Sequence, residues 1–287
     1  MRLACKHLKM IDMKKINFKL AIIVMMSLAI SLTSCKKDQD SAGDTSSASD
    51  DALAESIFNN VSNIADEAYS EKTAPYKSET GGRLLLGDCV EITLDTNSMP
   101  HSLIIDFGDE NCLCNDGRYR RGKIIVGFTG RYRRPGTVIS HSFDEYYVND
   151  SKVDGSKVVT NMGFNDSGNM HYNIDVVGVI YLAQGGTLSW NSSLDREWVE
   201  GLYTHTLWDD VYHITGSSDG IRANGHTWER EIVSPLRKEL SCRHIVSGTI
   251  EIKPDNKPLR ILDYGTGECD NIATVLINGV TYTIFLP

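Results

Sequence analysis

From Arg83 to the end of the chain, apolar and polar residues alternate with a period of two, which indicates strands and not helices. The candidate strands are short runs rich in Val, Ile, Thr and aromatic residues: Val90–Leu94, Ser102–Phe107, Lys123–Thr129, Thr137–Phe143, Tyr172–Val177, Val211–Thr215, Thr227–Ile232, Ser247–Ile252, Ala273–Ile277 and Thr281–Phe285. No helical pattern of useful length separates them, which argues against a parallel sheet with crossover helices. The sequence therefore predicts an antiparallel, hairpin-rich all-β sheet or sandwich over residues 83–287.

Turn signals support this prediction. Asx-Gly pairs accept positive φ and favour two-residue hairpins. They occur at Asp116-Gly117, Asp154-Gly155, Asp219-Gly220, Asn224-Gly225 and Asn278-Gly279. We expect each of these pairs to form a turn.

One amphipathic helix is predicted ahead of the sheet, in the segment 52–82, with a loop from Lys72 onward. Its apolar residues recur at spacings of three and four: Leu53, Ile57, Val61, Ile64, Ala65 and Ala68. Asp50 or Asp51 is placed to cap it. The stripe is typical of a helix that packs on the main domain, and docking to a partner protein is the alternative.

The first 34 residues have the pattern of a secretory signal peptide. Lys14 and Lys15 precede an apolar run from Leu20 to Leu32, which is too short to span a membrane comfortably. The run ends in Leu32-Thr33-Ser34-Cys35, which resembles a bacterial lipobox. We therefore predict that Cys35 is lipidated and anchors the chain to the outer membrane or cell surface. A buried Cys that ends a transmembrane helix is the alternative.

Residues 35–51 are predicted to form a flexible tether. The stretch Lys36–Asp51 is rich in Ser, Asp and Gly and contains no large apolar residue. Its charged start, Lys36–Asp40, also resembles the short signals that direct some lipoproteins of Bacteroidota to the cell surface. A plain spacer is an equally good interpretation.

The charge balance excludes some partners. The chain has 29 Lys and Arg against 38 Asp and Glu, for a net charge of −9. Residues 1–34 hold six basic residues and one acidic residue, so the remainder carries −14. Nucleic-acid binding needs a basic face, so no nucleic-acid partner is expected. An acidic chain is also repelled by anionic lipid headgroups, so the lipid alone is expected to hold it at the membrane.

Two stretches of the β region resemble each other. Residues 90–126 and 250–276 share the order strand, turn, strand, Asp-aromatic-Gly, Cys, strand. The Asp-aromatic-Gly elements are Asp106-Phe107-Gly108 and Asp263-Tyr264-Gly265. Cys112 and Cys269 occupy matching positions in the two stretches, which favours an internal duplication over the chance recurrence of a common β-hairpin pattern.

The resemblance between these two stretches guides the prediction of the disulfide pairs. Export passes through an oxidising compartment, so disulfides are expected. The repeat predicts Cys89–Cys112 and Cys242–Cys269, which leaves Cys114 over. Cys89–Cys114 is the competing pairing. Zinc binding is disfavoured because Cys112-Leu113-Cys114 has the wrong spacing and no second Cys pair exists.

Other candidate chemistry is weak. Gly216-Ser217-Ser218-Asp219-Gly220 matches the nucleophile-elbow pattern but lacks the helix that must follow it, so we interpret it as a turn at a strand end. The His residues show no metal-ligand spacing. No catalytic residue, metal ligand or cofactor motif is assigned.

Aromatic residues are the remaining candidates for ligand binding. Trp190, Trp198, Trp208 and Trp228, with Tyr146, Tyr147, Tyr203 and Tyr212, lie in the β region. Such rings on a sheet face can stack on sugars, so the four Trp residues are candidate ligand-stacking positions. Packing in the core is the commoner use of such rings.

Several segments together resemble a family of uncharacterised lipoproteins from Bacteroidota. The residues that carry the resemblance are Ser102–Gly108 with Cys112, Arg121–Val126, Thr129–Tyr132, Tyr146–Asn149, Trp208–Tyr212, Pro235-Leu236, Leu262–Gly265 and Cys269–Asn271. The resemblance spans residues 83–287 and brings no activity or site residues with it. Cys114 departs from the pattern.

The sequence as a whole favours a membrane-anchored envelope lipoprotein with a non-catalytic binding or structural role. A glycan or an envelope protein is the expected kind of partner. The alternative is an envelope hydrolase acting on glycans. An exposed row of aromatic rings would favour glycan binding, and two acids facing each other across a cleft would favour an enzyme.

Overall fold

The computed structural model describes residues 44–73, 85–131, 134–204, 206 and 208–286. The predicted signal peptide, Cys35 and the first part of the predicted tether lie outside these residues. Contacts divide the chain after Ser41, and the second unit, which begins at Ala42, contains every element described below.

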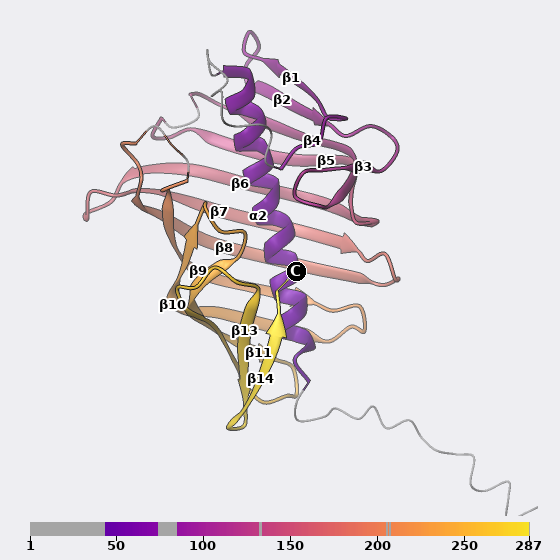
Figure 1. Ribbon diagram of the computed structural model, residues 1–287, viewed down its shortest axis with the longest axis vertical. Helices are drawn as coiled ribbons and strands as arrows, with labels where there is room; N and C mark the ends of the chain where they lie inside the picture. The colour runs from indigo at the N-terminus through magenta and orange to yellow at the C-terminus, as the bar shows by residue number, and fades with distance from the viewer. Residues whose placement is uncertain (1–43, 74–84, 132–133, 205, 207, 287) are drawn as a thin grey trace, which may run out of the picture. The chain divides into compact units, whose positions relative to one another are not determined.

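The described strands form one antiparallel sheet in which neighbours in sequence are neighbours in space, apart from the short β3, which pairs with β4 (Figure 1). The predicted antiparallel all-β fold is confirmed, and it is a single sheet. The strands are β1 (Glu91–Asp95), β2 (His101–Asp106), β3 (Cys112–Leu113), β4 (Tyr119–Phe128), β5 (Val138–Val148), β6 (Ser151–Phe164), β7 (Met170–Tyr181), β8 (Thr187–Glu200), β9 (Val211–Ile221), β10 (Thr227–Glu239), β11 (Ile245–Pro254), β12 (Arg260–Thr266), β13 (Ile272–Ile277) and β14 (Val280–Phe285). Strands β1 and β14 are its two edges.

Helix α2 (Ser46–Thr73) lies across one face of this sheet (Figure 1). Its predicted apolar stripe is buried, with Ile57, Val61 and Ile64 in the core and Leu53 partly buried. The helix therefore packs on its own domain, as the first interpretation expected.

The helix begins at Ser46, six residues before the predicted segment 52–82. The backbone N–H of Ser46 donates to the Asp44 carboxylate over 3.0 Å, and the N–H of Ser49 donates to the Thr45 carbonyl. Ala48 and Asp51 are buried against the sheet. Residues 46–51, predicted to be tether, are helical because tertiary contacts outweigh the weak helix propensity of a Ser-rich segment.

Three of the five Asx-Gly pairs form turns as predicted, at positions 116–117, 224–225 and 278–279. The other two predictions are wrong, because Asp154-Gly155 and Asp219-Gly220 lie inside β6 and β9. At Gly155 a side chain would overlap the Val177 carbonyl of β7. These glycines therefore permit close approach within long strands and do not reverse the chain.

Gly220 belongs to a row in which small and large residues alternate across the sheet. Gly178, Trp190, Gly220 and Trp228 face one another in register on β7 to β10. A side chain at Gly220 would overlap the Trp228 ring, and one at Gly178 would overlap Phe58 of the helix. Phe58 in turn stacks on Trp190, with ring centroids 5.8 Å apart. The glycines make room for the rings between helix and sheet.

In each predicted disulfide pair the two cysteines lie close together, and the two pairs are near opposite ends of the sheet. The Cα atoms of Cys89 and Cys112 are 6.0 Å apart, and those of Cys242 and Cys269 are 5.7 Å apart. Both pairs are bonded. Cys114 is a buried thiol outside both disulfides, and its Sγ donates to the Cys112 carbonyl.

The echoed sequences also share a turn. The Asp106 carboxylate accepts the Gly108 N–H over 2.9 Å, and the Asp263 carboxylate accepts the Gly265 N–H over 2.8 Å. Both glycines have positive φ, 82° and 94°. The Asp-aromatic-Gly element thus builds the same Asx turn in both places, as its residue types suggest.

Candidate functional site

The sheet face beneath helix α2 carries a row of polar side chains that point into the core. They share one register line across β5 to β12, interrupted by the apolar residues Val176 on β7 and Ile252 on β11, and all are nearly inaccessible to solvent. The polar members of this row are His141, Lys157, Ser192, Ser218, Arg230 and Arg260. Such a buried row needs partners, and the helix provides them.

The centre of this contact is an arginine of β10 between two acids of the helix. The Arg230 guanidinium lies 3.2 Å from an Asp51 carboxylate oxygen and donates to Glu55 over 3.1 Å. Asp51 and Glu55 are one helical turn apart, so both point at the same strand. We call Asp51, Glu55 and Arg230 the buried charge cluster.

Neutral donors complete the surroundings of Asp51. Its Oδ1 accepts from the indole N–H of Trp190 at 3.0 Å, from the Ser218 hydroxyl at 3.1 Å and from the indole N–H of Trp228 at 3.3 Å. A buried carboxylate oxygen needs hydrogen bonds that replace its lost water. The two tryptophans therefore serve the helix contact.

The pKa values in the cluster reflect one cation shared by two acids. Burial alone would lower the pKa of Arg230, but Asp51 and Glu55 outweigh burial and raise it above its ordinary value. Burial, together with the Asp51 carboxylate, raises the pKa of Glu55 against the opposing effect of Arg230. Burial therefore disfavours the charged form of Glu55, and the Tyr264 hydroxyl lies 3.5 Å from its carboxylate.

Lys157 and His141 lie farther along the same row. Lys157 donates to the Phe58 carbonyl of the helix over 2.8 Å, and burial lowers the pKa of Lys157 to about 7. Burial, followed by the charge of Lys157, lowers the pKa of His141 to about 3. Protonation of either group opposes folding, because the unfolded chain binds the proton more tightly.

Further ion pairs and hydrogen bonds hold the helix to the turn after β9, to the segment before β1 and to β4. Asp50 pairs with Arg222 over 2.6 Å, and the Leu85 N–H donates to Glu67 over 2.9 Å. In the middle, Arg120 donates to Asn60 over 2.7 Å. Buried charge in this domain therefore attaches an acidic helix to a basic sheet face.

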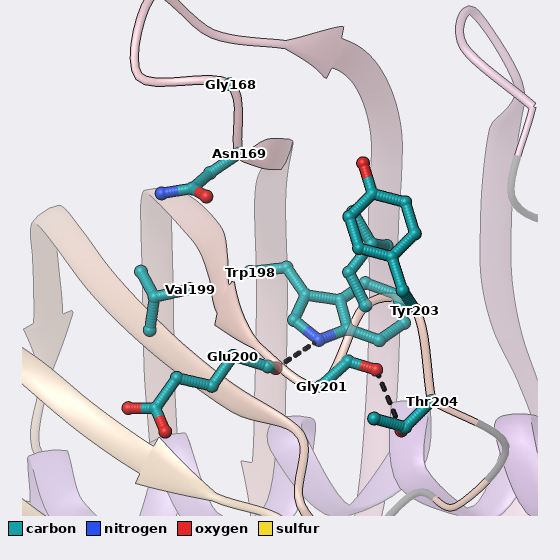
Figure 2. A pocket seen from close by; sticks show the side chains of 9 residues that line it. Gly168, Asn169, Trp198, Val199, Glu200, Gly201, Tyr203 and Thr204 are labelled. Carbon is teal, nitrogen blue, oxygen red and sulfur yellow. Dashed lines mark hydrogen bonds between the residues drawn. The ribbon is translucent and has the colours of Figure 1, made fainter.

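A solvent-facing hollow lies at the end of β8, on the loop that leads to β9 (Figure 2). Its volume is about 230 Å³. The hollow is lined by Gly168, Asn169, Trp198, Val199, Glu200, Gly201, Leu202, Tyr203 and Thr204. The volume of the hollow is below the roughly 300–1,000 Å³ of sites that enclose drug-sized ligands.

The floor of the hollow is fixed by the indole of Trp198. This ring is buried, packs against Tyr212 with centroids 5.4 Å apart, and donates to the Glu200 carbonyl over 2.6 Å (Figure 2). Gly201, with φ of 89°, then turns the chain out of the sheet. Tyr203 follows on this turn, and its side chain is 84% exposed.

Polar groups around the hollow are held by neighbours. The Asn169 amide donates to Glu197 over 2.9 Å, and the Thr204 hydroxyl donates to Asp209 over 2.8 Å. Glu200 pairs with Arg237 over 2.9 Å. The hollow thus offers a fixed apolar floor, a free aromatic ring and oriented polar side chains.

A second hollow, of about 220 Å³, lies against β12 and β13. Its acids serve turns of their own. Asp270 accepts the Ile272 N–H over 2.9 Å, and Glu268 accepts the Thr266 hydroxyl over 2.9 Å. Asp263 holds the Asx turn described above, so these carboxylates act in local structure.

The four candidate tryptophans do not form an exposed row. Trp190, Trp198 and Trp228 are buried, because the Gly-Trp row and the floor of the hollow use their rings in packing. Only Trp208, at 52%, is exposed among the four. The exposed ring at a hollow is Tyr203, and its position after Gly201 at a strand end was the available signal.

The predicted turn at Gly216–Gly220 is also wrong. The segment lies within β9, Ser217 pairs with Ser193 of β8, and Ser218 points inward to Asp51. Among the described residues no group of His, Cys, Asp and Glu could hold a metal ion. In the same part of the chain no helix is long and apolar enough to cross a membrane.

Sequence reasoning missed the buried charge cluster. Arg230 lies 175 positions or more from Asp51 and Glu55 along the chain, and no local pattern reveals such a pairing. The available signal was the acid pair Asp51 and Glu55, four residues apart beside the apolar stripe. Compared with known proteins, the chain matches no family model, no curated protein and no solved structure.

Proposed function

We propose that the chain is an envelope lipoprotein, anchored through Cys35 at the outer membrane or cell surface, with a non-catalytic binding role. It would belong with the Bacteroidota lipoproteins that it resembles. The support for anchoring is the order of segments: a basic start, an apolar run, Leu32-Thr33-Ser34-Cys35 and a polar stretch before helix α2.

The binding role rests on one observation, the exposed ring of Tyr203 at the hollow of β8. An aromatic ring open to solvent beside fixed amide, hydroxyl and carboxylate groups suits one unit of a glycan. The large rings elsewhere under the helix are committed to packing. The ligand we propose is therefore a glycan end, held by stacking on Tyr203.

Anchoring is tested by replacing the acylated residue. Cys35→Ala should move the protein from the membrane fraction to the soluble fraction, and metabolic labelling with a fatty acid should disappear. Ser34→Ala is the matched control, because a small residue at that position leaves the lipobox intact. Retention of Cys35→Ala in the membrane fraction would refute the anchor.

Binding is tested with a glycan array on the chain that starts at Lys36. Tyr203→Ala should lower the affinity for any bound glycan at least tenfold. Tyr181→Ala is the matched control, because Tyr181 is an exposed tyrosine at the opposite end of β7 from Asn169. Equal loss in both variants, or no glycan bound at all, would refute this binding site.

The hydrolase alternative is separated by the same reagents. A glycan that binds should be recovered unchanged after long incubation with the chain. Appearance of shortened products that persists in Tyr203→Ala would favour the enzyme.

A further inference from the structure

The two edges of the sheet differ in a way that bears on assembly. Each edge strand has a neighbouring strand on one side only within the described residues, β2 for β1 and β13 for β14. An open edge offers unpaired N–H and C=O groups to another strand. The composition of each edge decides which partner it can accept.

The register of β13 and β14 shows which backbone groups point outward. The N–H of Leu286 donates to the Asn271 carbonyl over 2.7 Å, and Ile277 and Val280 flank the two-residue turn. Hydrogen-bonded pairs alternate along an antiparallel ladder. Tyr282 and Ile284 therefore bond to β13, while Thr281, Thr283 and Phe285 direct both backbone groups to the open edge.

The side chains of these three outward residues are exposed as well. Phe285 is 73% accessible, and Thr281 and Thr283 are also exposed. The whole strand, Val280–Phe285, contains no charged residue and no proline. It therefore lacks the features that usually prevent pairing between edges.

We infer that β14 is a dimerisation edge, which pairs antiparallel with β14 of a second copy of this chain about a two-fold axis at Thr283. In that register Thr283 faces Thr283 of the partner subunit, and Thr281 faces Phe285 of the partner subunit. All three pairs join outward-directed backbone groups. Thr–Thr and aromatic–β-branched pairs are favourable across strands.

The charges on the two edge strands favour self-pairing of β14 and disfavour self-pairing of β1. The same self-pairing of β1, centred on Thr93, would place Glu91 opposite Asp95 twice, and like charges facing each other are unfavourable. The β14 pairing contains no like-charge contact in a chain that is acidic overall. Because the contact is isologous and β1 is blocked, assembly stops at two copies.

The test is a disulfide placed on the two-fold axis of the full chain, in a Cys114→Ala background. Thr283→Cys should form a covalent dimer on mild oxidation, since facing residues of a hydrogen-bonded pair lie within disulfide reach. Thr281→Cys should not, because it faces Phe285 of the partner subunit. Thr93→Cys, at the centre of the other edge, is the matched control and should form no covalent dimer.

The mass in solution provides a second readout. The unmodified chain should sediment at twice the monomer mass. Thr283→Pro should sediment as a monomer with an unchanged circular dichroism spectrum, because proline removes only an outward N–H. A monomeric parent chain, equal cross-linking of Thr283→Cys and Thr93→Cys, or species larger than a dimer would overturn the proposal.

Discussion

The echoed units, residues 90–126 and 250–276, share a local geometry and differ in how they meet helix α2. Both have a disulfide and an Asx turn, at Asp106 and Asp263. The aromatic residue between Asp and Gly is Phe107 in the first unit and Tyr264 in the second. Phe107 packs on the Tyr146 ring, whereas Tyr264 reaches Glu55 of the helix.

The difference separates two kinds of information in the sequence. The repeated residues build the Asx turn and supply one cysteine of each disulfide, Cys112 and Cys269. The aromatic residue that differs meets a ring of β5 in the first unit and a carboxylate of helix α2 in the second. The edges differ likewise, because β1 carries Glu91 and Asp95 and β14 carries no charge.

The largest loss of stability is expected from removing the Arg230 cation, which lies between Asp51 and Glu55. Arg230→Met leaves Asp51 and Glu55 buried without a counter-charge, which should cost about 3–5 kcal/mol of unfolding free energy. Urea unfolding measures the loss. Arg237→Met is the matched control in the same strand, because its ion pairs are partly exposed and worth about 0–1 kcal/mol. Equal losses in the two variants would contradict the assignment.

The disulfides should contribute equally if the units are equivalent. Cys89 and Cys112 are 23 residues apart and Cys242 and Cys269 are 27 apart, so each bond should stabilise the fold by about 3–4 kcal/mol through the unfolded chain. The measurement is the unfolding free energy of each double-Ala variant. A much larger loss for one pair would show that the units are not equivalent in stability.

The Asx turns should also respond alike. Gly108→Ala and Gly265→Ala each place a side chain at positive φ, which should cost about 1–2 kcal/mol. Nothing lies within 4 Å of the added Cβ at either glycine, so strain alone is measured. Thermal unfolding of both variants tests this, and losses that differ by more than twofold would argue against a shared turn.

The smallest effect concerns the residue that distinguishes the units. Tyr264→Phe gives the second unit the residue of the first and removes a donor near Glu55, which should cost about 1 kcal/mol. The reciprocal variant, Phe107→Tyr, places a hydroxyl among apolar neighbours and should also destabilise. If Tyr264→Phe were neutral and Phe107→Tyr stabilising, the contrast between polar and apolar contacts would be wrong.

The sequence predicts those features of the fold that a residue pattern within the sequence determines. The apolar stripe of the helix and the Asp-aromatic-Gly turns follow from local spacing, and the two disulfide pairs follow from the internal repeat. Strands β6 and β8 were missed because their inward residues include Lys157, Asn161 and Ser192, which hide the period of two. Lys157 points inward to donate to the Phe58 carbonyl of the helix, a partner 99 positions away in the chain that no local pattern reveals.

The candidate site could also be predicted only in part from the sequence. The four tryptophans could be named from the sequence, but not the faces on which they lie, since Trp190 and Trp228 are fixed by glycines on neighbouring strands and by Asp51. Tyr203 is exposed because Gly201 turns the chain away from the sheet. Gly201 is a local signal for the exposure of Tyr203, whereas the pairings that bury Trp190 and Trp228 have no local sequence signal.

A double-mutant cycle on Asp51 and Arg230 tests most directly whether the buried charge cluster holds the helix to the sheet. The unfolding free energies of Asp51→Asn, Arg230→Met and the double variant are compared with that of the parent chain. We predict that the double variant loses less than the sum of the single losses, by about 2 kcal/mol. Losses that add to within about 0.5 kcal/mol would mean that the two residues stabilise the fold independently, and would contradict this account.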